Sequence, residues 1–195
     1  LIHHTDYQKE GESLGLYPSF RPDKAFAIGQ PKSYTTYLHA LSEVVGFEIN
    51  SFDSLMEALF LRIDYFHARG CRLADHGLER MCFSTNKDLS TDSILQNALQ
   101  GIMPSPQEQE HFKFEVLRQL AKRYHAKGWV QQFHLGALRN TNSRMLRVLG
   151  PDTGFDSIGD FDSRHGAPFS VLLRFQCGVS VSCSREKLTI TSETP

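Results

Sequence analysis

The chain has 195 residues with a formal net charge of −1, and 40% of its residues are hydrophobic while 22% are charged. This balance is typical of a globular protein and argues against a disordered or fibrous one. The near-neutral charge gives no electrostatic sign of nucleic acid or lipid partners, and no apolar run approaches the roughly 20 residues of a membrane helix. The 4 cysteines form no CxxC pair, which favours reduced thiols. We therefore expect a cytoplasmic protein that binds neither nucleic acid nor a membrane.

Short apolar runs alternate with helical patterns along the chain. Strands are expected at residues 14–20, 71–74 and 129–135. Helices, with apolar residues three and four positions apart, are expected at residues 33–45, 52–69, 91–100, 105–127 and 142–149. Ser33 is the expected N-cap of the first helix. Ser105, Pro106 and Glu108 together form a helix-start signature for the fourth.

Strands that alternate with helices are typical of parallel βαβ units. An open doubly wound sheet and a barrel both fit this order, but no GxGxxG or GxxxxGK[ST] motif follows a strand, which weakens the nucleotide-binding version. A complete barrel has eight strands in typically about 250 residues, so this chain provides an arc at most. Residues 163–195 fit no such unit, and we expect one or two short strands there.

Polar residues stand at the end of the third expected strand. Side chains alternate along a strand, so Gln132 and His134 share one face, which we expect to be the interior, with His134 near its mouth. Arg139 and Asn140 follow in the loop, where an arginine can bind a carboxylate through two hydrogen bonds. The alternatives without a functional role are that His134 is a core histidine and that Arg139 is solvated or stabilises the loop.

The other two strands also end in polar groups. Asp75-His76-Gly77 suits metal ligation or proton transfer, although the same tripeptide makes an ordinary turn. Arg21 can bind an anion, or it can pair with Asp23 in a turn. Because the carboxyl ends of parallel strands meet at one edge of a sheet, we expect Arg21, Asp75 and His134 to converge.

Three segments carry a resemblance to a known family. They are PSFRPDKAF (18–26), RIDYFHARGCRLADHGLE (62–79) and FHLGALRNTNSRMLRVLGPDTGFDSIGD (133–160). In order and spacing they resemble the uronate (glucuronate) isomerases, a branch of the amidohydrolase superfamily. The resemblance implies an α/β fold that is a partial TIM (β/α)8 barrel of the metal-dependent hydrolase type, about strands 3 to 5 with inserted helices. It covers residues 1–162 and leaves 163–195 as a divergent tail of uncertain structure.

The family resemblance implies an aldose–ketose isomerisation in hexuronate catabolism, from D-glucuronate to D-fructuronate and from D-galacturonate to D-tagaturonate. Such a reaction moves hydrogen between C2 and C1, so it needs a base, an electrophile that stabilises the enediolate oxygens, and a cation for the substrate carboxylate. The resemblance implies that His134 is catalytic and that the hexuronate is bound by Arg21, Arg139 and Asn140. It places Asp75 and His76 close to the site.

The family holds a divalent metal, expected to be zinc, mainly through a His-x-His pair on the first barrel strand and an Asp on the last. Those positions lie outside the segments that match here, so no metal is expected to bind tightly to this chain, and the chain alone is expected to be inactive. The resemblance also allows a homo-oligomer of the full-length protein. Two alternatives stay open, namely a metal-dependent hydrolase on the same fold and a non-catalytic, truncated binding protein.

Overall fold

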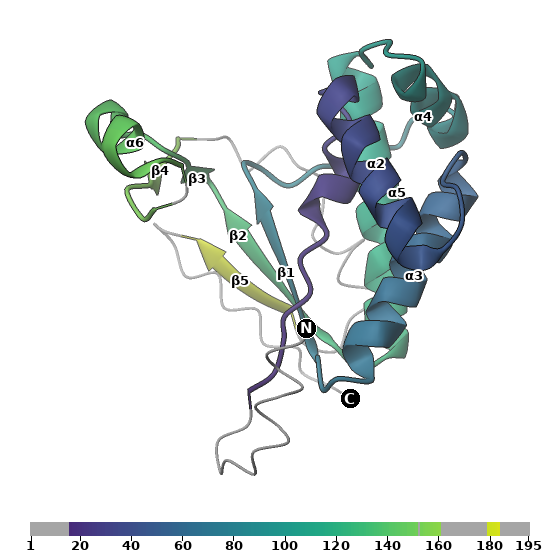
Figure 1. The fold of residues 1–195 in the computed structure, drawn as a ribbon, viewed down its shortest axis with the longest axis horizontal. Coiled ribbons are helices and arrows are strands. Elements are labelled where there is room, and N and C mark those ends of the chain that lie inside the picture. The colour runs from purple at the N-terminus through teal and green to yellow at the C-terminus, as the bar shows by residue number, and fades with distance from the viewer. Residues whose placement is uncertain (1–15, 152, 161–178, 184–195) are drawn as a thin grey trace.

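The computed structural model describes residues 16–151 and 153–160, together with the backbone of 179–183. The helices are η1 (Asp23–Phe26), α2 (Pro31–Val45), α3 (Phe52–His67), α4 (Thr91–Leu99), α5 (Pro106–Ala126) and α6 (Ser143–Leu149). The strands are β1 (Leu73–Leu78), β2 (Val130–Leu135), β3 (Ala137–Leu138), β4 (Ser157–Ile158) and β5 (Val179–Cys183). Figure 1 shows α2 to α5 as one layer on one side of the sheet, with α6, β3 and β4 as a separate small unit beside β2.

The main sheet is parallel, and its strands follow one another in chain order. β1 pairs with β2, and β2 pairs with β5. On the free side of β1, Phe20 forms an isolated parallel bridge with Ala74. The strand expected at 14–20 is therefore reduced to this bridge within residues 16–20, and its first two residues lie outside the described part. A strand expected in the last segment is confirmed by β5, which lies at residues 179–183.

The second strand differs from the sequence expectation. It runs over Leu73–Leu78 instead of 71–74, so Asp75-His76-Gly77 lies inside the strand and not in a loop after it. Asp and Gly are poor strand residues, but strand preference depends strongly on the neighbouring strands. Here the pairing with β2 continues in register as far as Leu78 and Leu135, which keeps the tripeptide extended.

The helices lie close to their expected positions, because their signals are local. The Ser105 capping box with Glu108 is confirmed, with Pro106 in the first turn of α5. The expected N-cap at Ser33 is wrong, because α2 begins at Pro31 with Gln30 as its N-cap, and the Ser33 hydroxyl donates to the Gln30 carbonyl. A proline at the first helical position has a suitable φ and lacks an N–H that would be unpaired there. None of the helices in the described ranges is both long and apolar enough to cross a membrane.

The core lies between the helices and one face of the sheet. Phe20 packs edge-on against Phe66, Tyr124 and Trp129, with ring centroids 5.1, 6.3 and 6.1 Å apart. Phe133 of β2 is buried on the same side. Edge-to-face aromatic pairs of this kind add stability beyond the apolar area that they bury.

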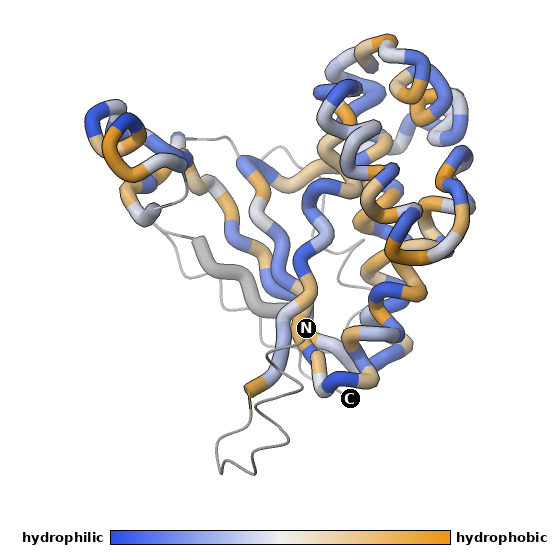
Figure 2. Tube along the Cα trace, in the orientation of Figure 1, coloured by the Kyte–Doolittle hydropathy of each residue, from blue (hydrophilic) through white to orange (hydrophobic). Residues whose placement is uncertain are grey.

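Burial alternates along β1 and β2. Figure 2 shows hydrophobic and hydrophilic residues mixed in both strands. In β2, Gln131, Phe133 and Leu135 are buried, whereas Gln132 and His134 are only partly buried. The expected alternation is therefore confirmed, and the face that carries His134 is the one turned away from the helices. We call this the inner face of the sheet.

Candidate functional site

The pairing of the strands decides which polar residues meet. Phe20 lies beside Ala74, and Ala74 lies beside Gln131, all three on the helix side of the sheet. Successive side chains of an extended chain point to opposite faces. The next residue of each segment therefore belongs to the inner face, and these are Arg21, Asp75 and Gln132.

His134 and Asp75 form the central pair of the inner face. The Nδ1 of His134 lies 2.5 Å from Oδ1 of Asp75. A carboxylate can only accept, so this contact places a proton on Nδ1. Nε2 is then the acceptor nitrogen, and the amide nitrogen of Gln132 lies 3.4 Å from it. The His134 side chain is 44% exposed, so Nε2 is within reach of a bound molecule.

Arg21 joins this pair from the neighbouring segment. Its Nη1 lies 3.4 Å from Oδ2 of Asp75, and its Nε donates to Oδ2 of Asp23 over 3.0 Å. The pairing of Arg21 with Asp23 is therefore confirmed, while anion binding by Arg21 stays a prediction. A Cβ at Gly77 would overlap the end of the guanidinium, so with any other residue there Arg21 would have to shift.

Asp23 is a part of the site that the sequence interpretation did not single out. Its carboxylate accepts from Nδ1 of His76 over 3.1 Å and from the Gly77 backbone N–H over 2.9 Å. Burial alone would raise the pKa of Asp23, but the hydrogen bonds from His76 and Gly77 and the nearby Arg21 together lower it. The available signal was the spacing of Arg21 and Asp23 directly after an extended segment.

The structure separates Asp75 from His76. Asp75 lies on the inner face with His134, whereas His76 is fully buried on the helix side, where its ring lies 5.6 Å from that of Phe133 and 5.9 Å from that of Tyr124. His76 is thus near the cluster, as expected, and the described contacts connect it to Arg21 through Asp23. Adjacent residues of a strand face opposite ways, which explains the separation.

Arg139 and Asn140 lie in the small unit formed by β3, β4 and α6. Nη1 of Arg139 donates to Asp156 over 2.6 Å, and the Asn140 backbone N–H donates to the same carboxylate over 3.0 Å. The Asn140 hydrogen bond and the Arg139 cation lower the pKa of Asp156. Asn140 has a left-handed backbone with φ of 57°. The described contacts stabilise this loop, in agreement with the non-functional alternative for Arg139. They do not bring Arg139 or Asn140 into contact with Arg21, Asp75 or His134.

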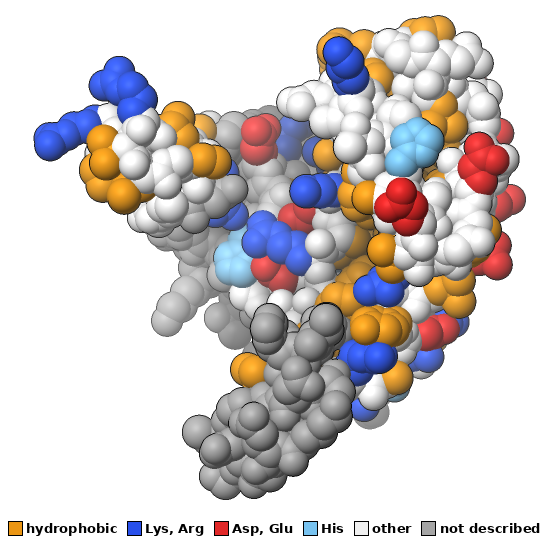
Figure 3. Space-filling model, in the orientation of Figure 1, with side chains coloured by type: hydrophobic (Ala, Val, Ile, Leu, Met, Phe, Trp, Pro, Cys, Tyr) orange, Lys and Arg blue, Asp and Glu red, His pale blue; other side chains and the backbone are white. Residues whose placement is uncertain are grey.

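The inner-face cluster consists of Arg21, Asp23, Asp75, Gln132 and His134. Figure 3 shows basic, acidic and histidine side chains gathered in the hollow between the unit of α6 and the helical layer. Cation, carboxylate and imidazole in one partly exposed hollow can bind an anion and move a proton.

The cluster does not make a complete metal site by itself. Across the residues with described side chains, no three His, Cys, Asp or Glu groups are arranged to hold an ion. Asp75 is already engaged by His134 and Arg21, so the pair offers one lone pair, that of His134 Nε2, to either a metal ion or a proton. A histidine held through its other nitrogen by a carboxylate is a common arrangement at metal sites.

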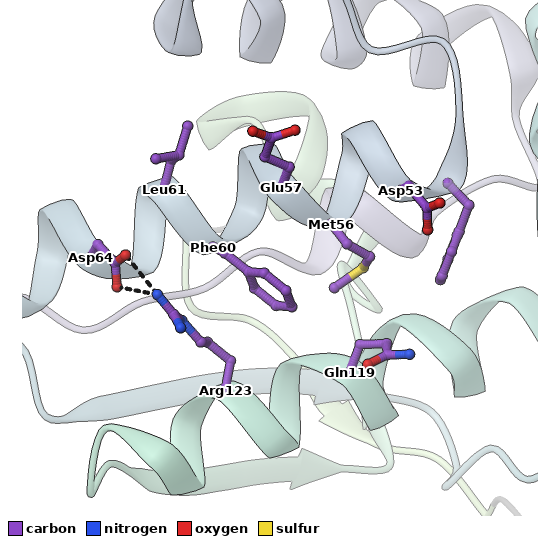
Figure 4. Close-up of a pocket in the computed structure, with 9 residues that line it drawn as sticks. Asp53, Met56, Glu57, Phe60, Leu61, Asp64, Gln119 and Arg123 are labelled. Carbon is purple, nitrogen blue, oxygen red and sulfur yellow. Dashed lines mark hydrogen bonds and ion pairs between the residues drawn. The ribbon is translucent and has the colours of Figure 1, made fainter.

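A second hollow lies between α3 and α5 and has a volume of about 390 Å³. Figure 4 shows Met56 and Phe60 on α3 facing Gln119 and Arg123 on α5. The ion pair between Arg123 and Asp64, with a 2.6 Å contact, closes one end. This groove shares no residue with the inner-face cluster and belongs to the packing of the helical layer.

The fold and the cluster define a parallel α/β protein with a polar site on the sheet face opposite its helices. The sequence model of the family described as "Glucuronate isomerase" matches residues 1–176. The chain belongs to this family. The match extends past residue 162, so the family resemblance covers more of the C-terminal region than expected.

Individual relatives agree with the family model. The chain is 44% identical over 161 residues to a protein of Flavobacterium johnsoniae named uronate isomerase, which covers 83% of this chain and 34% of the relative. A uronate isomerase of Cellvibrio japonicus is also 44% identical, over 82% of this chain and 34% of its own length. The chain therefore spans about a third of the length of the curated relatives it matches.

Two solved structures share the fold. The uronate isomerase of Thermotoga maritima matches with a TM-score of 0.81 and 24% identity, over 92% of this chain and 40% of the other. The glucuronate isomerase of Caulobacter crescentus matches with a TM-score of 0.76 and 23% identity, over 93% of this chain and 38% of the other. At these identities the likeness concerns the fold alone.

Proposed function

We propose that this chain carries part of the active site of a uronate isomerase, an enzyme that converts the aldose form of a hexuronate into its ketose. D-Glucuronate would give D-fructuronate, and D-galacturonate would give D-tagaturonate. The observation that carries the proposal is the contact of His134 and Arg21 with the same carboxylate, that of Asp75. It brings a candidate base and a candidate carboxylate-binding cation to one face of the sheet.

We further propose that the sheet is an arc of a (β/α)8 barrel. A doubly wound sheet reverses its strand order at a switch point and carries helices on both faces. Here the order is residue 20, β1, β2 and β5, without reversal, and the helical layer lies on one side (Figure 1). In a barrel the opposite face is the interior, and the active site lies toward the carboxyl ends of the strands. This arrangement supports a site around His134.

His134 is the proposed proton carrier. Isomerisation removes a proton from C2 and returns one to C1, with an enediolate between the two steps. The Nε2 of His134 has a lone pair for this purpose, because the contact with Asp75 keeps the proton on Nδ1. Asp75 orients the ring and stabilises the imidazolium that forms when Nε2 takes the proton.

Arg21 is the proposed partner of the C6 carboxylate of the hexuronate. A guanidinium offers several N–H donors in a planar fork that matches a carboxylate. Asp23 and Asp75 hold it at the inner face. The roles of Arg139 and Asn140 in substrate binding remain predictions; both lie on the unit of β3 and α6, which flanks the hollow in Figure 3.

A divalent metal, zinc in the first instance, belongs to the same proposal for the complete enzyme, where it would stabilise the enediolate oxygens as a Lewis acid. The ligands offered by the described side chains do not suffice to hold it, and the steps assigned to His134 and Arg21 do not depend on its geometry. A cytoplasmic location and a homo-oligomer of the complete enzyme are further parts of the proposal.

A graft tests the function directly. Residues 16–160 of this chain replace the matching segment of the Flavobacterium johnsoniae uronate isomerase, and the product formed from D-glucuronate or D-galacturonate with added zinc is identified by NMR. The graft should form the ketose, and His134→Gln in the graft should lower kcat by at least about a hundredfold. A graft that unfolds cooperatively but forms no ketose, beside an active parent enzyme, overturns the proposal.

A further inference from the structure

The carboxylate of Asp23 connects His76, on the buried side of the sheet, with Arg21, on its inner face. Its Oδ1 accepts from His76, and its Oδ2 accepts from the Gly77 N–H and from Nε of Arg21. The carboxylate is thus fixed by a buried ring and by the backbone of β1. These contacts leave it little freedom to rotate, so its direction sets the direction of the guanidinium.

The imidazole of His76 is energetically unfavourable at its buried position. It is fully buried, and its ring lies among those of Phe26, Tyr124 and Phe133 at centroid distances of 6.1, 5.9 and 5.6 Å. Its Nε2 finds no hydrogen-bond partner among the described residues. A buried polar atom without a partner destabilises the fold, so an aromatic hydrocarbon ring would suit this place better. What only the imidazole provides is the Nδ1–H bond to Asp23.

The guanidinium of Arg21 depends on this arrangement. Nε is held by Asp23 at 3.0 Å, while Asp75 is reached by Nη1 at the longer distance of 3.4 Å. The absent side chain of Gly77 leaves the space in which the guanidinium lies. The contact with Asp23 is therefore the shorter of the two ion pairs described for Arg21. It is also the one whose carboxylate is held by the buried His76.

We infer that Asp23 and His76 are positioning residues, which hold the guanidinium of Arg21 at the inner face for the carboxylate of an anionic sugar. The carboxylate ligand rests on the proposed function, whereas the positioning of Arg21 stands on the contacts alone. Neither residue touches the substrate in this arrangement. Both act through Arg21.

The test compares two substitutions of His76 in the 195-residue chain. His76→Phe keeps a ring but removes the donor, whereas His76→Asn keeps an N–H donor close to the position of Nδ1. Two signals are followed, the exchange rate of the Arg21 Nε–H by NMR, assigned with Arg21→Ala, and the Kd for D-glucuronate. His111→Phe is the matched control, because His111 is also buried but bonds to Ser84 away from the cluster.

His76→Phe should accelerate exchange of the Arg21 Nε–H by at least about tenfold and weaken D-glucuronate binding by about tenfold, since a hydrogen bond to a charged group is lost. Its melting temperature should stay within about 5 °C of wild type, because removal of the unpaired buried nitrogen offsets part of the lost bond to Asp23. His76→Asn should restore both signals to within about threefold of wild type, and His111→Phe should change neither.

The outcomes separate the inference from the proposed function. Unchanged Arg21 exchange in His76→Phe overturns the positioning role, and so does a loss of binding that accompanies general unfolding without rescue by His76→Asn. If His76→Phe fails to fold, Asp23→Asn replaces it, with the same expected acceleration of Arg21 exchange. If Arg21 responds as expected but the wild-type chain does not bind D-glucuronate, the positioning role stands and the carboxylate ligand is refuted.

Discussion

The Nδ1 of His134 lies 2.5 Å from Oδ1 of Asp75, although the two residues are 59 positions apart in the sequence. The parallel register of β1 and β2 creates this contact, because it places Asp75 beside Gln132 and Gly77 beside His134. The contact fixes which nitrogen of His134 carries a proton.

Asp75→Asn should change the tautomer of His134. The amide can turn either its oxygen or its nitrogen toward Nδ1, and it lacks the negative charge that favours a proton there. We expect the proton of the neutral ring to be shared between Nδ1 and Nε2, which the ¹⁵N shifts of His134 report. Asp64→Asn is the control, because Asp64 binds Arg123 and Lys127 instead of a histidine. An unchanged Nδ1–H tautomer in Asp75→Asn would refute the orienting role of Asp75.

Gly77→Ala should displace Arg21. The added methyl group overlaps the end of the guanidinium, so the guanidinium must shift from its present position, where it contacts Asp23 and Asp75. We expect a loss of about 1–3 kcal/mol in the free energy of unfolding, measured with urea, and weaker D-glucuronate binding. Gly29→Ala is a matched control, because its methyl group meets the end of the Gln109 side chain, away from the cluster. Equal effects of the two substitutions on binding would count against a special role for Gly77.

Asp23 should make stability depend on pH in the acid range. Its pKa is lowered from the ordinary value of 3.8 in the folded chain, so folding favours the ionised form. Its contribution is therefore fully present above that ordinary value and is lost as the pH falls through the folded pKa. The difference in unfolding free energy between wild type and Asp23→Asn should be about 1–3 kcal/mol at pH 7 and should shrink below about pH 4.

This prediction is checked by urea denaturation at several pH values between neutral and acid. The exposed Asp88 offers a control, since Asp88→Asn should leave the pH profile of wild type in place. A difference for Asp23→Asn that stays constant down to the acid end would show that its carboxylate is not held as described.

Cys71 and Cys82 should resist thiol reagents in the folded chain. Burial raises the pKa of the Cys82 thiol to about 12 and also raises that of Cys71. The thiolate is the reactive form, so Cys82 should react with iodoacetamide at pH 8 about a thousandfold more slowly than a free cysteine. The substitutions Cys177→Ser and Cys183→Ser leave only the two thiols of interest. Rapid labelling of Cys82 without unfolding would contradict its burial.

The sequence predicted best what is encoded locally. Ser105 and Glu108 form a capping box within one turn, and the bond from the Ser105 N–H to Glu108 is the predicted one. The end of β1 depends on distant residues instead. In isolation, the tripeptide Asp75-His76-Gly77 has the composition of a turn. It is extended because β1 pairs with β2, which begins at Val130.

The site was predicted in part. The convergence of Arg21, Asp75 and His134 is confirmed. Its cause is the parallel register and the shared face of the sheet, because Asp75 lies inside β1 and not at its end. The sequence predicts Asp23 only as a turn partner of Arg21, because its role in the cluster depends on the His76 ring, which reaches it from the other side of β1. Strand alternation does distinguish Asp75 from His76, but only once the tripeptide is known to be extended.

The most direct measurement of the central claim is an NMR titration of the chain with D-glucuronate, beside D-glucose, which has no carboxylate. We predict saturable shifts of the Arg21 Nε–H and of the His134 ring with D-glucuronate, at least about tenfold weaker binding of D-glucose, and loss of this preference in Arg21→Ala. The account is contradicted if the two sugars bind equally well, or if D-glucuronate shifts other residues and leaves Arg21 and His134 unchanged.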